Sequence, residues 1–370
     1  MVRLAALIRV RISIIVSSFW RTTPTPAQAT AVWQWFNHAE QLATAKGRSI
    51  LRVNLDETSV CLFPGSTAGS VFVSLKRSRE GCVQTVAKWK RRCCLTHVGL
   101  ICDQADIQPQ LPQFVVGNER TFLARNMPAL RLACPPNVTL VRQKSAWSSA
   151  ALTARVVREI AAALRRLGAR SRNLQVVLVM DAARIHFAPV VLRACRAAGV
   201  WVVIVPAKTT WLLQPLDTHA FSHYKSELRR AYQRARTGSA NPNGDLEIGE
   251  FLVCVYHAIR TVLQGRRWAV AFDRDGFGAK QAALSVKVLQ RLSLRGRVDI
   301  PSNRPSPAQV GLCFPRRAKV EVALLWDAYD GVVRARLRRC AVAAIDASNS
   351  RLRLAVGRPH EASGAVLHYR

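Results

Sequence analysis

Hydrophobic runs with the pattern of β-strands lie shortly before three aspartates, Asp56, Asp181 and Asp217. The runs are Ile50–Leu55, Leu174–Met180 and Trp201–Pro206. Carboxylate oxygens are the ligands that Mg²⁺ prefers, and two such ions can activate an attacking oxygen and stabilise a leaving oxygen. If the three side chains converge, they indicate metal-assisted cleavage of phosphodiester bonds. The alternative for each is a helix N-cap, a position where Asp is favoured.

The charge of the chain favours a nucleic acid as the partner. The 370 residues include 55 Lys and Arg against 22 Asp and Glu, a net charge of +33. Between Glu119 and Asp217 the acidic residues are Glu159 and Asp181, so an aspartate that closes an apolar strand stands out. Arginine binds phosphate bidentately, and we expect DNA as the partner. The alternative is a compositional bias toward Arg and Ala.

Other functional classes find less support in the composition. The 49% of hydrophobic residues is enough for a sizeable core. No uncharged apolar run is long enough to cross a bilayer, so we expect no membrane association. The ten cysteines lack the spacing of a zinc site, and we read them as reduced thiols. We expect no structural metal and no small-molecule cofactor.

Several polar side chains are candidates for contact with nucleic acid. They are His186, Lys208, Gln214, Lys88, Lys90, Arg91, Arg92, Arg229 and Arg230. Trp89 lies within one basic run and could stack on bases. The alternatives are a packing role for His186, turn or capping roles for Lys208 and Gln214, and a solvated face for the basic runs.

The order of elements predicts an α/β fold of the ribonuclease H-like class, a mixed sheet with flanking helices, and a helical C-terminal extension. A helix is expected at 25–46, followed by a strand at 50–55 and then a β-rich block with strands at 59–63, 70–75, 93–102, 113–116 and 138–142. Helices are expected at 150–167, 187–198 and 218–236, strands at 174–180 and 201–205, and helical structure at 246–293. In such a sheet the carboxyl ends of strands face a common crevice, so distant aspartates can converge.

Four segments are expected along the chain. Residues 1–30 are an N-terminal segment of uncertain role, and 31–240 are the core with the ribonuclease H-like fold. Residues 241–294 continue the core as helices, and 295–370 form a basic C-terminal extension, Pro- and Arg-rich and extended at 295–317. The nucleus is the expected location, with an organelle transit peptide as the alternative.

Three motifs resemble those of the pogo, Tigger and jerky-type transposases and the relatives of centromere protein B. Residues 54–60 (NLDETSV) resemble N-x-D-E-T-x-V, and residues 178–186 (LVMDAARIH) resemble L-x-x-D-N-A-x-x-H. Residues 206–217 (PAKTTWLLQPLD) resemble P-P-N-T-T-x-x-L-Q-P-L-D, the most specific of the three. The resemblance covers about residues 33–290.

This resemblance implies the catalytic core of a DDE superfamily endonuclease. Asp56, Asp181 and Asp217 correspond to the triad that binds Mg²⁺ (or Mn²⁺), and the thirty-five residues between the second and third are close to the family's usual interval. The implied chemistry is hydrolytic nicking of DNA followed by strand transfer, without a covalent enzyme intermediate. Transposases of this kind pair on DNA, so a homodimer on DNA is expected.

Two departures from the family pattern support an alternative function. Ala182 stands where the family has Asn after the second aspartate, and losses of this kind next to a metal ligand often lower metal affinity or rate by about 10–100-fold. No helix-turn-helix pair is legible ahead of the core. The alternative is a catalytically silent, domesticated protein that binds nucleic acid or chromatin, and a more distant one is a ribonuclease or repair nuclease.

Overall fold

The computed structural model describes residues 25–61, 94–168, 173–207, 209–237, 246–278 and 282–315. The chain divides into two compact units, Met1–Ala328 and Tyr329–Arg370, and the second lies outside the described residues, as does the strand expected at 70–75. Of the expected segments, the described parts belong to the first unit, and the four-part division stays a prediction.

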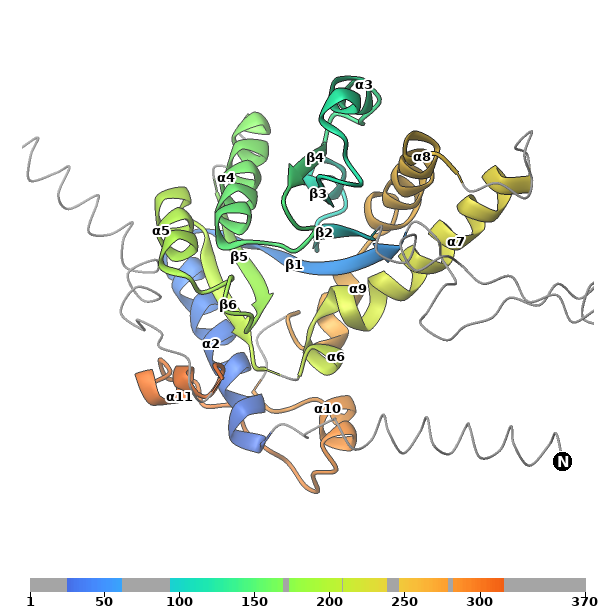
Figure 1. Cartoon of the computed structure of the whole chain (residues 1–370). Helices are drawn as coiled ribbons and strands as arrows, with labels where there is room; N and C mark the ends of the chain where they lie inside the picture. The colour runs from blue at the N-terminus through green and yellow to red at the C-terminus, as the bar shows by residue number, and fades with distance from the viewer. Residues whose placement is uncertain are drawn as a thin grey trace, which may run out of the picture. The chain divides into compact units, whose positions relative to one another are not determined.

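The described strands form one six-stranded mixed sheet (Figure 1). They are β1 (Ser49–Cys61), β2 (Cys94–Cys102), β3 (Gln113–Asn118), β4 (Val138–Gln143), β5 (Leu174–Asp181) and β6 (Trp201–Val205), in the order β4-β3-β2-β1-β5-β6. The β1–β2 and β2–β3 pairs are antiparallel, whereas β3–β4, β1–β5 and β5–β6 are parallel. The fold is therefore ribonuclease H-like, as the element order predicts.

Strand β1 is longer than the sequence indicates. We expected a strand that ends at Asp56 and a separate strand after it, but β1 continues to Cys61 because its second half pairs with β2, from Asp56↔Gly99 to Cys61↔Cys94. Residues 56–59 are all polar, yet Thr58 and the following Val60 are buried in the sheet. The parallel pairing with β5, however, stops at Asn54↔Val179, so Asp56 still lies where the β1–β5 pair ends.

Helices flank the sheet. They are α2 (Pro26–Ala45), α3 (Met127–Leu132), α4 (Ala150–Arg166), α5 (Pro189–Ala198), α6 (Thr210–Leu213), α7 (Phe221–Thr237), α8 (Ile248–Ala258), α9 (Ala269–Arg274), α10 (Val286–Arg291) and α11 (Pro307–Gly311). Strand β6 and the six central residues of β5 are buried throughout, as expected for parallel strands covered on both faces. Helices α4 and α5 pack side by side (Figure 1).

Of the helices expected after β6, the one at 218–236 is confirmed and the longer region is not. A π-helical turn, Leu216–Ala220, leads directly into α7, which ends at Thr237. The expected helical region 246–293 is interrupted after a second π-helical turn, Ile259–Gln264. Residues 295–317 were expected to be extended, but they contain α11, whose capping box uses Ser306. None of the described helices is long and apolar enough to cross a membrane.

The side chain of Arg52 connects four segments of the core. Its guanidinium forms ion pairs with Asp103 at 2.7 Å and with Glu40 of α2 at 3.1 Å. The same group donates to the backbone carbonyl of Gly278, after α9. A side chain that is 17% exposed therefore links β1 to α2, to the end of β2 and to the segment after α9. These contacts satisfy a charge that would be costly to bury alone.

Candidate active site

The structure brings the three aspartates to one edge of the sheet. Asp56 lies in β1, 7% exposed, just beyond the last residue pair with β5. Asp181 is the last residue of β5. Asp217 lies in the π-helical turn before α7 and is exposed. Because β1 and β5 are parallel, their carboxyl ends share an edge, and the turn with Asp217 returns to it.

None of the three aspartates is the N-cap of a helix, so that alternative is wrong for each of them. Asp56 lies inside a strand. The N-cap residue of α5 is Ala188, and that of the π-helical turn is Pro215. Each carboxylate is thus placed by the sheet or by the turn rather than by a capping requirement.

The electrostatics of Asp56 show that the carboxylates share one environment. Burial raises the pKa of Asp56 well above its ordinary value. The negative charges of Asp217, Glu57 and Asp181, in that order, raise this pKa further. The amide of Glu57, which donates to Asp56 Oδ1 at 2.8 Å, opposes the shift. A bound cation would relieve the repulsion among these groups.

His186 occupies the space beside Asp181. Its Nδ1 donates to Asp181 Oδ1 at 2.5 Å, and its Nε2 donates to Glu57 Oε1 at 3.2 Å. Burial alone would lower the pKa of His186, but the hydrogen bonds to the two carboxylates and their charges raise it to about 10. The imidazolium therefore bridges β1 and the end of β5 through Glu57 and Asp181.

The same bridge determines the ionisation of Asp181. Burial would raise the pKa of this carboxyl, but the hydrogen bond and charge of His186, with the amide of Ala183, hold it below its ordinary value. Asp181 is therefore ionised and has one oxygen committed to two donors, Ala183 N at 3.1 Å and the His186 ring. Its second oxygen is left to bind a ligand.

The donor set suits a hard divalent cation, but the ligands are not gathered around a single point. Among the described residues no three His, Cys, Asp or Glu side chains lie close enough to hold a metal ion together. The three aspartates supply the oxygen donors that Mg²⁺ or Mn²⁺ takes, and Asp217 has no hydrogen-bond or ion-pair partner among the described residues. Metal binding therefore requires the carboxylates to move closer together than they lie here.

Asn54 connects the three segments that carry the aspartates, and sequence reasoning gave it no role. Its side-chain amide donates to the carbonyl of Val179 at 3.0 Å, two residues before Asp181. Its Oδ1 accepts from the amide of Leu216 at 2.7 Å, one residue before Asp217. The residue is fully buried and stands two positions before Asp56. A buried amide in an apolar strand was the signal that could have identified it.

Asp275 holds the turn with Asp217 from the other side. Its carboxylate is fully buried and accepts from Thr218 Oγ1, from His219 Nε2 at 3.1 Å and from Lys287 Nζ at 3.0 Å. Thr218 and His219 directly follow Asp217, so these bonds fix the π-helical turn, a feature often found at functional sites. No motif in the sequence pointed to Asp275, because its partners come from two other elements.

Phe221 brings α7 onto the sheet beside Asp56. Gly99 is the β2 residue opposite Asp56, and a Cβ at this glycine would lie 3.2 Å from Phe221 Cε1. The missing side chain therefore lets the first residue of α7 approach β2. This approach carries Asp217, four residues earlier, to the edge where Asp56 lies.

Two predicted contacts with nucleic acid are not supported by the positions of the residues. His186 has no exposed surface and is bonded to two carboxylates. Gln214 is also fully buried, and its amide donates to Leu55 O at 3.5 Å. Both side chains pack inside the core beneath the aspartates, so contact with DNA in this conformation is excluded.

The remaining predicted contacts stay predictions. Arg229 and Arg230 are exposed on α7, and Arg230 forms an ion pair with Glu227 at 2.9 Å. The others lie outside the described residues, namely Lys88, Lys90, Arg91, Arg92 and Lys208.

Comparison with known proteins relates part of the chain to a protein family. Residues 95–266 match the family model described as "DDE superfamily endonuclease". This segment is similar to DDE superfamily endonuclease domains. It includes Asp181 and Asp217, whereas Asp56 lies ahead of it. No curated protein matches the chain.

Solved structures of a mariner transposase are also similar to the chain. Two of them are "Crystal structure of the Mos1 mariner paired end complex with Mn" and "Mos1 transposase paired-end complex with left transposon end". Each is 15% identical, with a TM-score of 0.31, and the match covers 66% of this chain. The chain covers 62% of each Mos1 chain. The fold assignment rests on the strand order rather than on these superpositions.

Replacing Asn54 by Ala should destabilise the protein by about 1–3 kcal/mol, because Val179 O and Leu216 N would remain buried without partners. Asn137→Ala is the matched control: its amide also donates to two carbonyls, those of Pro109 and Leu111. Asn137 is only half-buried, so water can replace its bonds. Urea unfolding measures both variants, and an equal loss in the two would contradict the role given to Asn54.

Replacing Asp275 by Asn should lower the free energy of unfolding by roughly 2 kcal/mol, because Lys287 loses its counter-charge and a buried acceptor oxygen is replaced by an NH₂ group. Lys287 and His219 are both partly exposed, and solvation by water limits the loss. Asp273→Asn, an exposed carboxylate two residues earlier, should change stability by less than about 0.5 kcal/mol. Thermal unfolding of the two variants compares them directly.

Proposed function

We propose that the protein is a transposase-derived endonuclease that cleaves DNA phosphodiester bonds with the help of Mg²⁺ or Mn²⁺. The observation that carries the proposal is the position of Asp56, Asp181 and Asp217 at one edge of the sheet, where the charges of Asp217 and Asp181 raise the pKa of Asp56. The match of residues 95–266 to the DDE superfamily endonuclease model supports it. The net charge of +33 suits a DNA substrate.

In this proposal the three carboxylates hold the cation, each from a different element. When bound, divalent ions would activate the attacking oxygen and stabilise the leaving oxygen of the phosphodiester. Asp181 contributes the oxygen that His186 leaves available, and His186 keeps that carboxylate ionised. Asp217 is free to turn toward the other two because no described residue binds its side chain. Asn54 and Asp275 hold the backbone on which these movements depend.

A second function is favoured by specific features of the same site. Ala182 offers no side-chain amide next to Asp181, His186 holds one oxygen of that aspartate, and no three potential ligands are gathered among the described residues. A protein that keeps the fold and its affinity for DNA, without cleavage, would tolerate all three features. Pairing of two copies of this chain on DNA stays a proposal.

Purified protein should nick supercoiled plasmid in the presence of Mg²⁺ or Mn²⁺, and Asp181→Asn should lower the nicking rate by about 100-fold or more. The reason is the loss of one anionic ligand from the three. Glu119→Gln, a surface carboxylate paired with Arg142 at 3.3 Å, serves as the control and should nick at the normal rate. Nicking that persists in Asp181→Asn, or after chelation of divalent ions, would contradict the proposed mechanism.

Binding of the metal to the folded state should also raise the melting temperature. At Mn²⁺ concentrations about 100 times the dissociation constant the stabilisation is about 3 kcal/mol, and Asp217→Asn should reduce it strongly. The readout does not depend on cleavage, so it separates the two functions. Stabilisation that is lost in Asp217→Asn supports the endonuclease, whereas DNA binding without any response to metal supports the silent DNA-binding protein.

A further inference from the structure

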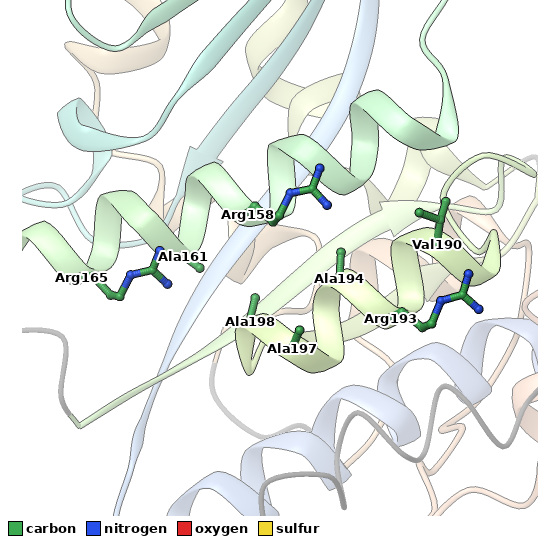
Figure 2. A pocket seen from close by; sticks show the side chains of 8 residues that line it. All are labelled: Arg158, Ala161, Arg165, Val190, Arg193, Ala194, Ala197 and Ala198. Carbon is green, nitrogen blue, oxygen red and sulfur yellow. The ribbon is translucent and has the colours of Figure 1, made fainter. Parts of the chain in front are cut away.

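An arginine-rimmed hollow lies between α4 and α5, and none of the three aspartates lines it (Figure 2). Its volume is about 480 Å³. The lining residues are Arg158, Ala161 and Arg165 of α4 and Val190, Arg193, Ala194, Ala197 and Ala198 of α5. Figure 2 shows the arginines at the rim and the alanines between the two helices. The hollow exists because small side chains face each other where the helices pack.

The three arginines of the rim are exposed and have no partner in the described part of the chain. The side chains of Arg158, Arg165 and Arg193 form no hydrogen bond, ion pair or ring contact with any described residue. No acidic residue is among the eight that line the hollow. By contrast, Arg52 and Arg230 elsewhere in the structure are paired with carboxylates. The positive charge of the rim is therefore available to a ligand.

The spacing of these charges suits an extended polyanion. Arg158 and Arg165 are seven residues apart, which places them on one face of α4 about 10 Å apart along the helix axis. Arg193 lines the same hollow from the second turn of α5 (Figure 2). A ligand that meets all three guanidiniums must carry negative charges along its length, as one strand of a nucleic acid backbone does.

The floor of the hollow suits the sugar–phosphate backbone rather than base edges or a peptide. Alanine methyl groups offer no hydrogen bonds, so they can neither read a base nor pair with a peptide backbone. The guanidinium group of arginine binds phosphate bidentately. These features together favour a sequence-independent contact in which the phosphates meet the arginines and the sugars lie over the alanines.

We propose that the α4–α5 hollow is a docking site for the phosphodiester backbone of DNA, built by Arg158, Arg165 and Arg193 over an alanine floor. The inference rests on the proposed function only in taking DNA as the partner. The site does not include the aspartates, and it binds DNA whether or not the carboxylates cleave it. It adds affinity without sequence preference.

The test is the salt dependence of binding of the full chain to a labelled DNA duplex, measured by fluorescence anisotropy between about 50 and 200 mM salt. Each phosphate contact that is lost lowers the slope of log affinity against log salt by about 0.9. The triple variant Arg158→Ala, Arg165→Ala, Arg193→Ala should therefore lose roughly 2–3 units of slope. The loss should be the same for duplexes of different sequence.

A matched triple variant controls for net charge alone. Arg120, Arg125 and Arg131 are exposed arginines between β3 and β4, and their replacement by Ala removes the same total charge. The slope of this variant should change by less than about 1. An equal loss of slope in the two triple variants would overturn the proposal, because the hollow would then contribute no more than any basic surface.

A further variant tests the hollow without removing charge. Ala197 is exposed and lines the floor, so Ala197→Leu fills part of the space and keeps all three arginines. DNA affinity should fall at every salt concentration while the melting temperature stays unchanged. Unchanged affinity in this variant would show that the backbone does not enter the hollow and would overturn the proposal.

Two further outcomes separate this proposal from others. Polyglutamate that binds through the three arginines while DNA binding by the triple variant stays normal would assign the hollow to an acidic protein and overturn the proposal. If the wild-type protein fails to nick DNA while the triple variant shows the expected loss of slope, the docking site is supported and the endonuclease is contradicted. Nicking by a triple variant with the wild-type slope would do the reverse.

Discussion

The buried side chain of Asn54 is the contact on which the geometry of the candidate site depends. It lies two residues before Asp56, bonds to the carbonyl two residues before Asp181, and accepts from the amide one residue before Asp217. Three segments far apart in the chain are thus held at one point by a single amide. An amide suits this position because it both donates and accepts, and because it adds no charge beside three carboxylates. The parallel pairing of β1 with β5, which ends at Asn54↔Val179, supplies the fixed frame.

The site concentrates negative charge within a strongly positive protein. Burial and three neighbouring carboxylates raise the pKa of Asp56, while His186 compensates Asp181 and Glu57 as a buried cation. The imidazolium of His186 therefore offsets the repulsion around Asp181 and Glu57. The repulsion around Asp56 and Asp217 is left for a bound ligand to offset. This part of the site is where a divalent cation would have its largest electrostatic effect.

The basic surface and the acidic centre have separate structural origins. The carboxylates are positioned by strand ends and a π-helical turn, whereas the unpaired arginines of the hollow come from two outer helices, α4 and α5. Helix packing with alanines between the two helices leaves a hollow, and arginines at its rim remain solvated. Binding of DNA and any cleavage of it can therefore change independently, which is why the two proposals need separate measurements.

From the sequence alone we could predict the fold class, the strands that lead to the aspartates, and which aspartates lie at one edge of the sheet. Apolar runs and their periodicity are local properties, so β2 to β6 and helices α2 and α4 could be predicted from them. Tertiary structure alone decided the length of β1, whose polar half is held by pairing with β2. It also decided that His186 and Gln214 are buried rather than exposed to DNA, because burial depends on which elements cover a residue. The roles of Asn54 and Asp275 arise from partners on other elements, and spacing along the chain carries no record of such contacts.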